Sequence, residues 1–261
     1  MQFPRFLVAS AALCAVAVAF AQSATIPNAA PSPAAATVQI PPAPTPTGAA
    51  SWLIMDYSNG QVLASQNPDQ RLEPASITKV MTSYVVAAEL KAGKIKRTDQ
   101  VLISENAWRG GGGGTDGSTS FLPLNSTVSL DELERGMIIQ SGNDAAIALA
   151  EHVAGSEQAF TDLMNNYAKK IGMNNSHFVT PHGLSAPEHY STARDLALLG
   201  RAMIRDFPET YAYNKIRDYT VNGILQHNRN GLLWKDASVD GIKTGHTSAA
   251  GYCLLASAKR G

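Results

Sequence analysis

Charge of one sign, cysteine and long apolar runs are all scarce in this sequence. The 261 residues carry 21 basic and 21 acidic side chains, so no long-range field marks the chain as a partner of nucleic acid or anionic lipid. Of its two cysteines, Cys14 lies in an N-terminal segment that is expected to be removed. Cys253 alone cannot form an internal disulfide. The sequence therefore predicts neither a polyanion-binding protein nor a disulfide-stabilised scaffold.

The one long apolar run lies at the N-terminus. Arg5 precedes an apolar stretch over residues 6–20, and the small residues Ala19 and Ala21 suit a signal peptidase. A membrane helix needs about 20 apolar residues, more than this stretch provides. Residues 1–24 are therefore predicted to be a signal peptide of an exported protein, with an uncleaved membrane anchor as the alternative.

Residues 25–48 are rich in proline and alanine and show no apolar period. Such a segment cannot bury enough surface to offset its ordering entropy. It is predicted to be a semi-extended linker, with a ligand for a polyproline-binding module as the alternative. The remaining residues, 49–261, are long enough for one domain with a sizeable core.

Local signals in this domain predict strands at both ends and helices between them. Asn59-Gly60 between two β-rich runs predicts a hairpin at residues 51–66, and Gly93 ends a helix predicted from Ser76 to about Lys91. A capping box at Ser129 and Glu132 begins a further helix. Additional helices are predicted at 144–153, 157–171 and 193–205, and strands in "VDGIKTG" and "AAGYCLLASAK". This pattern is typical of an α+β protein with an antiparallel sheet closed by segments distant in sequence.

Ser76 and Lys79 stand at the start of the first predicted helix. Side chains three residues apart share a helix face, so the lysine amine can approach the serine hydroxyl. The helix dipole and free N–H groups there favour a developing oxyanion. Burial and a second nearby cation would lower the pKa of Lys79 so that it can act as a base. Taken alone, the pair is better explained as a serine N-cap followed by a solvated lysine.

Two later motifs supply complementary groups. Ser141-Gly142-Asn143 places a hydroxyl and an amide on a turn between two predicted helices. Lys243-Thr244-Gly245 places a cation and a hydroxyl on a predicted edge strand, and its glycine lets a substrate backbone approach closely. Each motif is weak alone, but their order and spacing together match one known type of active site.

With these motifs the chain resembles the serine D-alanyl-D-alanine carboxypeptidases, the low-molecular-mass penicillin-binding proteins, whose fold is shared with class A β-lactamases. The resemblance covers about residues 49–261 and includes "EPASITKVMT", "MIIQSGNDAAIALAEHVAGS", "FVTPHGLS", "HNRNGLLW" and "DGIKTGHTSAAGYCL". It implies a penicillin-binding-protein and β-lactamase-like transpeptidase fold. It also implies an enzyme of the bacterial periplasm or cell envelope that acts on peptidoglycan stem peptides ending in D-Ala-D-Ala, without a metal or organic cofactor. β-Lactam antibiotics are the second expected ligand.

The resemblance also implies roles for single residues. Ser76 is the expected nucleophile, Lys79 its base and Ser141 a proton relay to the leaving amine. The remaining residues are expected to bind the substrate: Asn143, Arg229, Lys243, Thr244, Gly245 and His246. The backbone N–H groups of Ser76 and His246 are expected to form the oxyanion hole.

Two departures separate the chain from class A β-lactamases. The middle motif is S-G-N rather than S-D-N, and Glu157, Glu188 and Glu209 do not stand in the E-x-x-L-N setting of a deacylating glutamate. Both favour a peptidase. A β-lactamase or D,D-endopeptidase of the same fold remains the alternative enzyme.

The sequence stops within the expected closing sheet. Relatives continue with a strand and a C-terminal helix, and often with a second domain and an amphipathic membrane anchor. The expectation is therefore a C-terminally truncated domain whose missing strand lies between the N-terminal hairpin and the strand ending near Lys259. A longer form is expected to associate peripherally with the membrane. The alternative to an enzyme is an inactive or unstable fragment that retains the motifs without a competent site.

Other features are given simpler interpretations. The five glycines Gly110–Gly114 lack the following lysine and serine or threonine of a phosphate-binding loop and are predicted to form a flexible loop. The histidines show no metal-binding spacing, and His182 and His189 are predicted to be loop residues. Asp195 is interpreted either as orienting the site or as an N-terminal helix acid.

Overall fold

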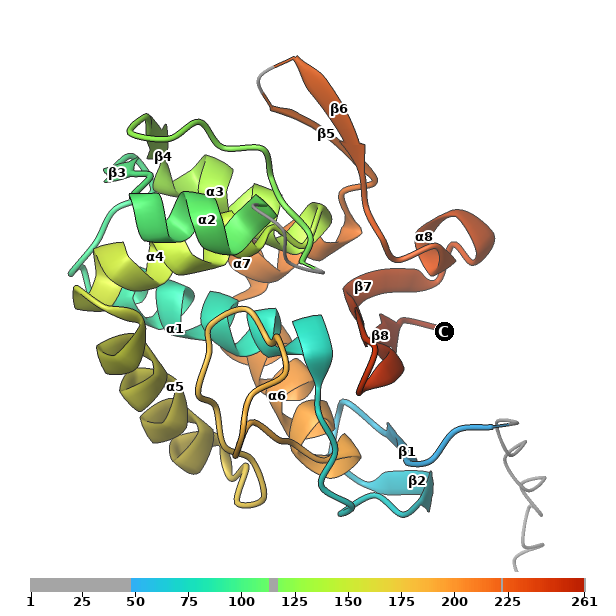
Figure 1. Cartoon of the computed structure of the whole chain (residues 1–261). Coiled ribbons are helices and arrows are strands. Elements are labelled where there is room, and N and C mark those ends of the chain that lie inside the picture. The colour runs from blue at the N-terminus through green and yellow to red at the C-terminus, as the bar shows by residue number, and fades with distance from the viewer. Residues whose placement is uncertain (1–47, 113–116, 222, 261) are drawn as a thin grey trace, which may run out of the picture. The chain divides into compact units, whose positions relative to one another are not determined.

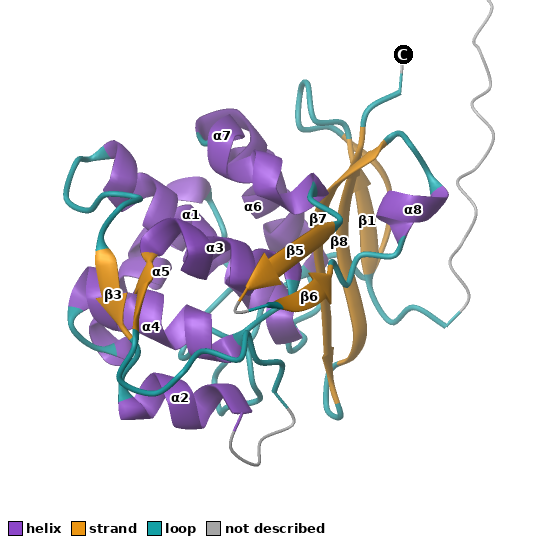
Figure 2. Ribbon diagram, turned by 90° about the horizontal axis from the view of Figure 1, so that it is seen from above, coloured by secondary structure: helices purple, strands orange, loops and turns teal. Residues whose placement is uncertain are grey.

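The computed structural model describes residues 48–112, 117–221 and 223–260, and they belong to the compact unit Pro44–Gly261 (Figure 1). The predicted signal peptide and almost all of the predicted linker lie outside the described residues. Most helices occupy one side of this unit, and the strands β1 (Trp52–Met55), β7 (Val239–Thr247) and β8 (Gly251–Ala258) occupy the other, together with the short helix α8 (Leu232–Lys235) (Figure 2). The architecture is α+β, as predicted.

The helices surround one buried helix, α1. Their bounds are η1 (Ala75–Ile77), α1 (Thr78–Lys91), α2 (Glu105–Gly112), α3 (Leu130–Ile139), α4 (Asn143–Ala154), α5 (Glu157–Ile171), α6 (Ala193–Asp206), α7 (Pro208–Tyr211), η2 (Ala212–Lys215) and α8 (Leu232–Lys235). Almost every residue of α1 is buried, because α3, α4, α5 and α6 all pack against it. Gly93 follows the end of α1 with φ 71°, as predicted. The start differs slightly, since a 3₁₀ turn precedes the α-helix.

The turn between α3 and α4 forms where the sequence predicts it. Ser129 caps α3 and accepts a hydrogen bond from the backbone N–H of Glu132. Helix α3 ends at Ile139, and Ser141 has φ 70°, an uncommon left-handed conformation for a residue other than glycine. This conformation reverses the chain and lets α4 begin at Asn143.

The strands form four antiparallel pairs. Their bounds are β1 (Trp52–Met55), β2 (Val62–Gln66), β3 (Gln100–Leu102), β4 (Thr127–Ser129), β5 (Asp218–Val221), β6 (Ile224–His227), β7 (Val239–Thr247) and β8 (Gly251–Ala258). The predicted hairpin is β1–β2, and the two predicted C-terminal strands are β7–β8. The hairpin β5–β6 and the short pair β3–β4 are additions to the prediction.

The hairpins β1–β2 and β7–β8 pack on the same helix but are not joined by hydrogen bonds between their strands. Helix α6 packs against both β1 and β8. Within the described ranges, however, β1–β2 and β7–β8 are separate two-stranded sheets. One continuous sheet from both chain ends is therefore not formed by these strands alone. The expected strand between them stays a prediction.

The glycine run corrects an expectation. Gly110, Gly111 and Gly112 belong to the end of α2, whereas Gly113 and Gly114 lie outside the described residues. An ideal Cβ on Gly111 would come within 2.2 Å of Asp144 Cβ. The prediction of a flexible loop is thus wrong for the first three glycines, because the absence of side chains lets α2 pack closely against α4.

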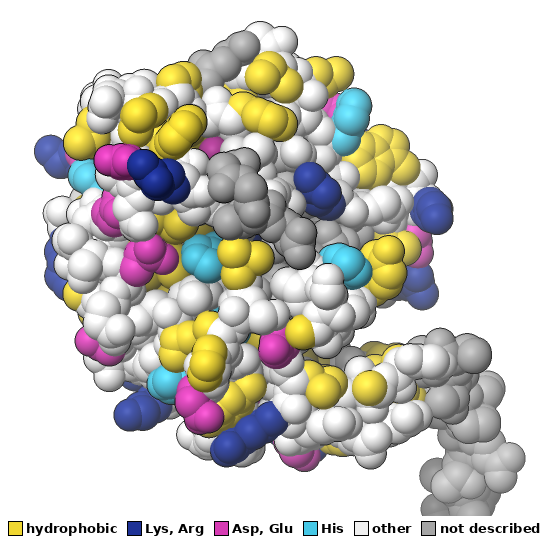
Figure 3. Space-filling model, viewed as in Figure 1, with side chains coloured by type: hydrophobic (Ala, Val, Ile, Leu, Met, Phe, Trp, Pro, Cys, Tyr) yellow, Lys and Arg dark blue, Asp and Glu magenta, His cyan; other side chains and the backbone are white. Residues whose placement is uncertain are grey.

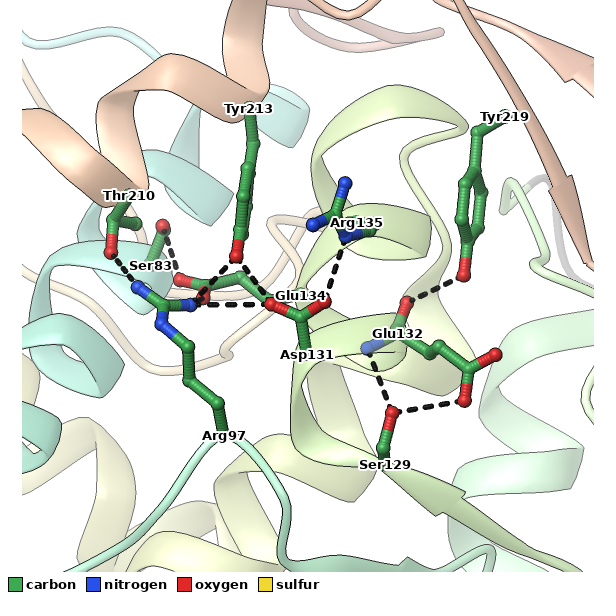
Figure 4. A network of polar contacts seen from close by, with 10 residues as sticks. All are labelled: Ser83, Arg97, Ser129, Asp131, Glu132, Glu134, Arg135, Thr210, Tyr213 and Tyr219. Atoms are coloured by element: carbon green, nitrogen blue, oxygen red, sulfur yellow. Dashed lines mark hydrogen bonds and ion pairs between the residues drawn. The ribbon is translucent and has the colours of Figure 1, made fainter.

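A set of buried and partly buried polar groups joins α1 to α3 and to the segment around η2 (Figure 4). The Glu134 carboxylate accepts hydrogen bonds from Ser83 Oγ and from Arg97 Nη1, both at 3.0 Å. Arg97 also donates to Tyr213 Oη at 3.0 Å and to Thr210 Oγ1 at 2.9 Å. The Glu134 side chain is fully buried, so these contacts supply the hydrogen bonds that water would otherwise make.

The molecular surface agrees with the balanced charge. On the face shown in Figure 3, basic and acidic side chains are scattered and gather in no patch of one sign. No helix in the described part of the chain is long and apolar enough to span a membrane.

Candidate active site

Ser76 lies in the 3₁₀ turn that leads into α1. Pro74 and Ala75 before it are buried, and Ala75 has φ 48°. The Ser76 side chain remains partly accessible. This irregular entry therefore presents the Ser76 hydroxyl at the N-terminal end of α1. Almost all of α1 itself is buried.

Lys79 connects three segments that are far apart in the sequence. Its ammonium nitrogen lies 3.0 Å from Ser76 Oγ, 2.7 Å from Asn143 Oδ1 and 2.8 Å from the carbonyl oxygen of His182. The predicted approach of Lys79 to Ser76 is therefore present. The side chain is 1% exposed, so these three acceptors replace its hydration.

Electrostatics favour the neutral form of Lys79. Burial, and next the charge of Lys243, hold the pKa of Lys79 well below its ordinary value, while Asp144 opposes the shift and Arg229 adds to it. Burial and Arg229 also lower the pKa of Lys243 to about 7. A neutral lysine amine beside a serine hydroxyl can accept its proton.

The turn residues Ser141 and Asn143 are both buried. The Asn143 side chain is oriented by the hydrogen bond that its Oδ1 accepts from Lys79. Within the described ranges, Asn143 Nδ2 and Ser141 Oγ have no hydrogen-bond partner. Because buried polar atoms are normally paired, these two atoms are candidates for contact with a substrate. The role of Ser141 as a proton relay to the leaving amine stays a prediction.

Strand β7 runs past the serine. Gly245 packs so closely on the 3₁₀ turn that an ideal Cβ would lie 3.0 Å from the Ser76 backbone nitrogen and 3.1 Å from the Pro74 oxygen. A side chain there would displace the strand. Thr244 is partly buried, and the exposed His246 ring lies against Tyr252 with ring centroids 4.4 Å apart.

Lys243 and Arg229 bring positive charge to the same site from different elements. Lys243 is buried on β7 and donates to the Thr244 carbonyl at 3.1 Å. Arg229 follows β6, is exposed, and donates through Nε to the Gln140 carbonyl at 3.1 Å, directly before the Ser141 turn. The site thus brings together a serine hydroxyl, a lysine amine of lowered pKa and further basic side chains that suit a carboxylate.

The structure adds two residues that the sequence did not single out for the site. The His182 carbonyl is the third partner of Lys79, and the Asp144 carboxylate binds the segment before α3. Only the histidine's loop position had been predicted, and it is confirmed. Burial, together with Lys79, lowers the pKa of His182 to about 3, so its ring is neutral.

His189 and Asp195 have contacts that stabilise the loop between α5 and α6. His189 lies in this loop, as predicted, with Nε2 2.9 Å from Thr78 Oγ1. Asp195 lies in the first turn of α6 and accepts hydrogen bonds from the Asn175 backbone N–H and Ser176 Oγ. Asp195 thus has the position of an N-terminal helix acid, and its carboxylate also holds residues 175 and 176 of the loop before α6.

Comparison with known protein families agrees with this geometry. The family model described as D-alanyl-D-alanine carboxypeptidase matches residues 37–261. The chain belongs to this family. The matched residues include all three motifs.

Individual relatives support the same assignment. The chain is 55% identical over 215 residues to D-alanyl-D-alanine carboxypeptidase DacC of Escherichia coli, covering 82% of this chain and 54% of the relative. It is 51% identical to the solved structure of penicillin binding protein 5 from Haemophilus influenzae, with a TM-score of 0.79, covering 83% of this chain and 63% of that one. The chain therefore spans about half the length of the curated relatives that it matches.

A more distant solved structure is penicillin-binding protein D2 from Listeria monocytogenes in a cefotaxime-bound form. It is 29% identical, with a TM-score of 0.72, and the match covers 81% of this chain and 84% of that one. The structural similarity thus extends to a penicillin-binding protein solved in a cefotaxime-bound form.

Proposed function

We propose that this chain is a serine D,D-carboxypeptidase that removes the terminal D-alanine from peptidoglycan stem peptides. The observation that carries the proposal is the buried Lys79 amine, 3.0 Å from Ser76 Oγ and 2.7 Å from Asn143 Oδ1. An amine of lowered pKa beside the partly accessible Ser76 hydroxyl supports the role of Lys79 as the base. Membership of the carboxypeptidase family supports the same reaction.

In the acylation step, Ser76 Oγ attacks the carbonyl carbon of the penultimate D-alanine while Lys79 takes the hydroxyl proton. The C–N bond then breaks, and the proton taken by Lys79 passes through Ser141 to the leaving amine of the terminal D-alanine, so that both residues return to their neutral forms. Backbone N–H groups of Ser76 and His246 stabilise the oxyanion. One such donor is typically worth about 3 kcal/mol in the transition state.

In the deacylation step, water attacks the Ser76 ester, releases the shortened peptide and restores the hydroxyl. No carboxylate of the described residues is hydrogen-bonded to Ser76 or Lys79. This supports a peptidase over a β-lactamase that relies on a glutamate for deacylation.

Substrate binding follows from the remaining groups. Asn143 Nδ2 binds a substrate amide, Gly245 lets the peptide backbone lie along β7, and Lys243, Thr244 and Arg229 hold the terminal carboxylate. Two cations near one carboxylate favour a substrate that ends in a free acid. The protein accordingly trims stem peptides and limits their crosslinking.

The protein acts in the periplasm or cell envelope after export directed by residues 1–24. β-Lactam antibiotics acylate Ser76 because they resemble the D-Ala-D-Ala terminus. The cefotaxime-bound relative supports this ligand class. A longer form of the protein associates with the membrane surface through a segment beyond the catalytic domain.

The first experiment is covalent labelling of purified residues 25–261 by a fluorescent penicillin, followed by measurement of D-alanine release from a diacetyl-L-Lys-D-Ala-D-Ala peptide. Labelling and release are expected for the native chain. Both should be absent from Ser76→Ala, whose circular dichroism should match the native chain, and labelling should be absent from a heat-denatured sample. Persistent labelling of Ser76→Ala, or a folded native chain that neither labels nor releases D-alanine, would contradict the proposal.

A further inference from the structure

We infer that Asp144 positions the Ser141-Gly142-Asn143 turn and supplies the buried negative charge that balances the cations of the catalytic site. This inference rests on the proposed function. Asp144 directly follows Asn143 at the start of α4 and is 1% exposed. It is a positioning residue, because its contacts are with the protein rather than with reacting atoms.

The Asp144 carboxylate binds a segment that is distant in the sequence. It accepts hydrogen bonds from the Ser120 backbone N–H at 2.8 and 3.0 Å, from Thr119 Oγ1 at 2.9 Å and from the Leu122 backbone N–H at 3.3 Å. Only the contact with the Ala145 backbone N–H, at 2.9 Å, comes from its own helix. An acid that only stabilised the helix N-terminus would need none of the contacts to residues 119–122.

The same segment holds the catalytic turn through other atoms. The Asn143 backbone N–H donates to the Ser118 carbonyl at 2.8 Å. An ideal Cβ on Gly142 would lie 2.0 Å from Ser120 Oγ and 2.6 Å from Asp144 Oδ1. Residues 118–122 therefore pack directly against the turn, and a displacement of Asp144 would be transmitted to Asn143 and Ser141.

The charge of Asp144 has no direct ion pair. Within the described part of the chain, no cation lies within salt-bridge distance of this carboxylate. Burying a carboxylate is unfavourable unless hydrogen bonds and nearby positive charge compensate for the lost hydration. Here the compensation comes from backbone donors and from the cations of the active site.

The groups acting on Lys79 comprise cations on two elements and one acid. Lys243 on β7 and Arg229 after β6 lower the pKa of Lys79, and Asp144 raises it. His182, whose carbonyl also contacts Lys79, has a neutral ring. Removing the Asp144 charge should therefore make Lys79 a free base at lower pH, while loss of its hydrogen bonds should disorder the turn.

The test is the pH dependence of Ser76 acylation by a chromogenic cephalosporin, measured in the pre-steady state with Asp144→Asn. The midpoint of the rising limb should move by about one pH unit to lower pH. The plateau rate should fall by about tenfold, because misplaced catalytic groups lose effective molarity. Thr119→Val is the matched control: it removes one neutral donor to the same carboxylate and should leave the midpoint unchanged.

Asp144→Glu separates charge from position and also serves if Asp144→Asn does not fold. It should keep the midpoint close to that of the native chain while lowering the plateau by about tenfold. Rates are referred to active sites titrated with penicillin, and thermal unfolding is measured alongside. Folded variants that acylate with the native midpoint and plateau, and lose only thermal stability, would overturn the inference. Failure of the native chain itself to acylate would instead contradict the proposed function.

Discussion

Helix α1 contacts two buried charged groups that the protein treats in opposite ways. Lys79, near its start, meets three neutral oxygen acceptors and has other cations nearby. One turn later, Ser83 contacts Glu134, which is paired with the Arg97 guanidinium (Figure 4). The first charge is left without a direct counter-charge, and the second is provided with one.

This difference distinguishes a site that can react with a substrate from a network that stabilises the fold. A buried lysine among cations is unfavourable for stability but useful as a base, so its arrangement indicates function. A buried glutamate that binds a guanidinium and the Ser83 hydroxyl keeps α1 and α3 together. Both groups depart from their ordinary pKa through burial, so a perturbed pKa alone would not distinguish the two regions.

The largest expected effect comes from removing the catalytic amine. Lys79→Ala should slow acylation of Ser76 by about 10²- to 10⁴-fold, the usual contribution of a general base. Stopped-flow acylation by a chromogenic cephalosporin measures the rate, and circular dichroism checks the fold. An unchanged rate in the folded variant would remove Lys79 from the mechanism.

The next effect is on stability rather than on rate. Arg97→Met leaves Glu134 buried without its counter-charge and should lower the free energy of unfolding by about 3 kcal/mol at pH 8. Acylation per folded molecule should change little. Urea unfolding measures the loss, and Arg135→Met is the control: it breaks the more exposed pair with Asp131 and should cost less than about 1 kcal/mol.

The pH dependence sharpens this prediction. Burial raises the pKa of Glu134 to about 7, so the folded state retains a proton that the unfolded state loses above its ordinary pKa. The contribution of Glu134 to stability therefore falls as pH rises from about 4.5 through 7. The loss in Arg97→Met should be greater at pH 8 than at pH 5.5. Equal losses at both values would show that Arg97 acts through packing alone.

The smallest expected effect is a gain in the free energy of unfolding rather than a loss. The pKa of Lys243 is lowered to about 7, so the unfolded state binds more protons between pH 7 and the ordinary lysine pKa, and native stability rises with pH across this window. Lys243→Met should weaken that dependence, to which the lowered pKa of Lys79 also contributes, and should raise the free energy of unfolding by about 1 kcal/mol at pH 7. It should also weaken D-alanine release. Thermal unfolding from pH 6.5 to 10 tests this, and a variant less stable than the native chain at pH 7 would contradict it.

Local signals were sufficient for much of the fold. The Asn59-Gly60 pair found the first hairpin, and helix α5 has the predicted bounds. The contact of Lys79 with Ser76 followed from their three-residue spacing. These features depend on residues close in sequence, where steric and hydrogen-bonding preferences act directly.

Features that depend on distant segments were missed. The His182 carbonyl reaches Lys79 across 103 residues, and a backbone oxygen carries no side-chain signature. The packing of the glycine run against α4 was likewise visible only in three dimensions. The β5–β6 hairpin is different, because Asn222-Gly223 gave the same signal that identified the first hairpin and could have been used.

The three acceptors of Lys79 have a consequence for the nascent and unfolded chain. They come from the helix start, the α3–α4 turn and the loop before α6, so the lysine loses its water only after all three have assembled. Before that point it is an ordinary hydrated ammonium group, and Ser76 is an ordinary alcohol. If the proposed function holds, Ser76 and Lys79 should therefore stay unreactive until the tertiary structure is complete.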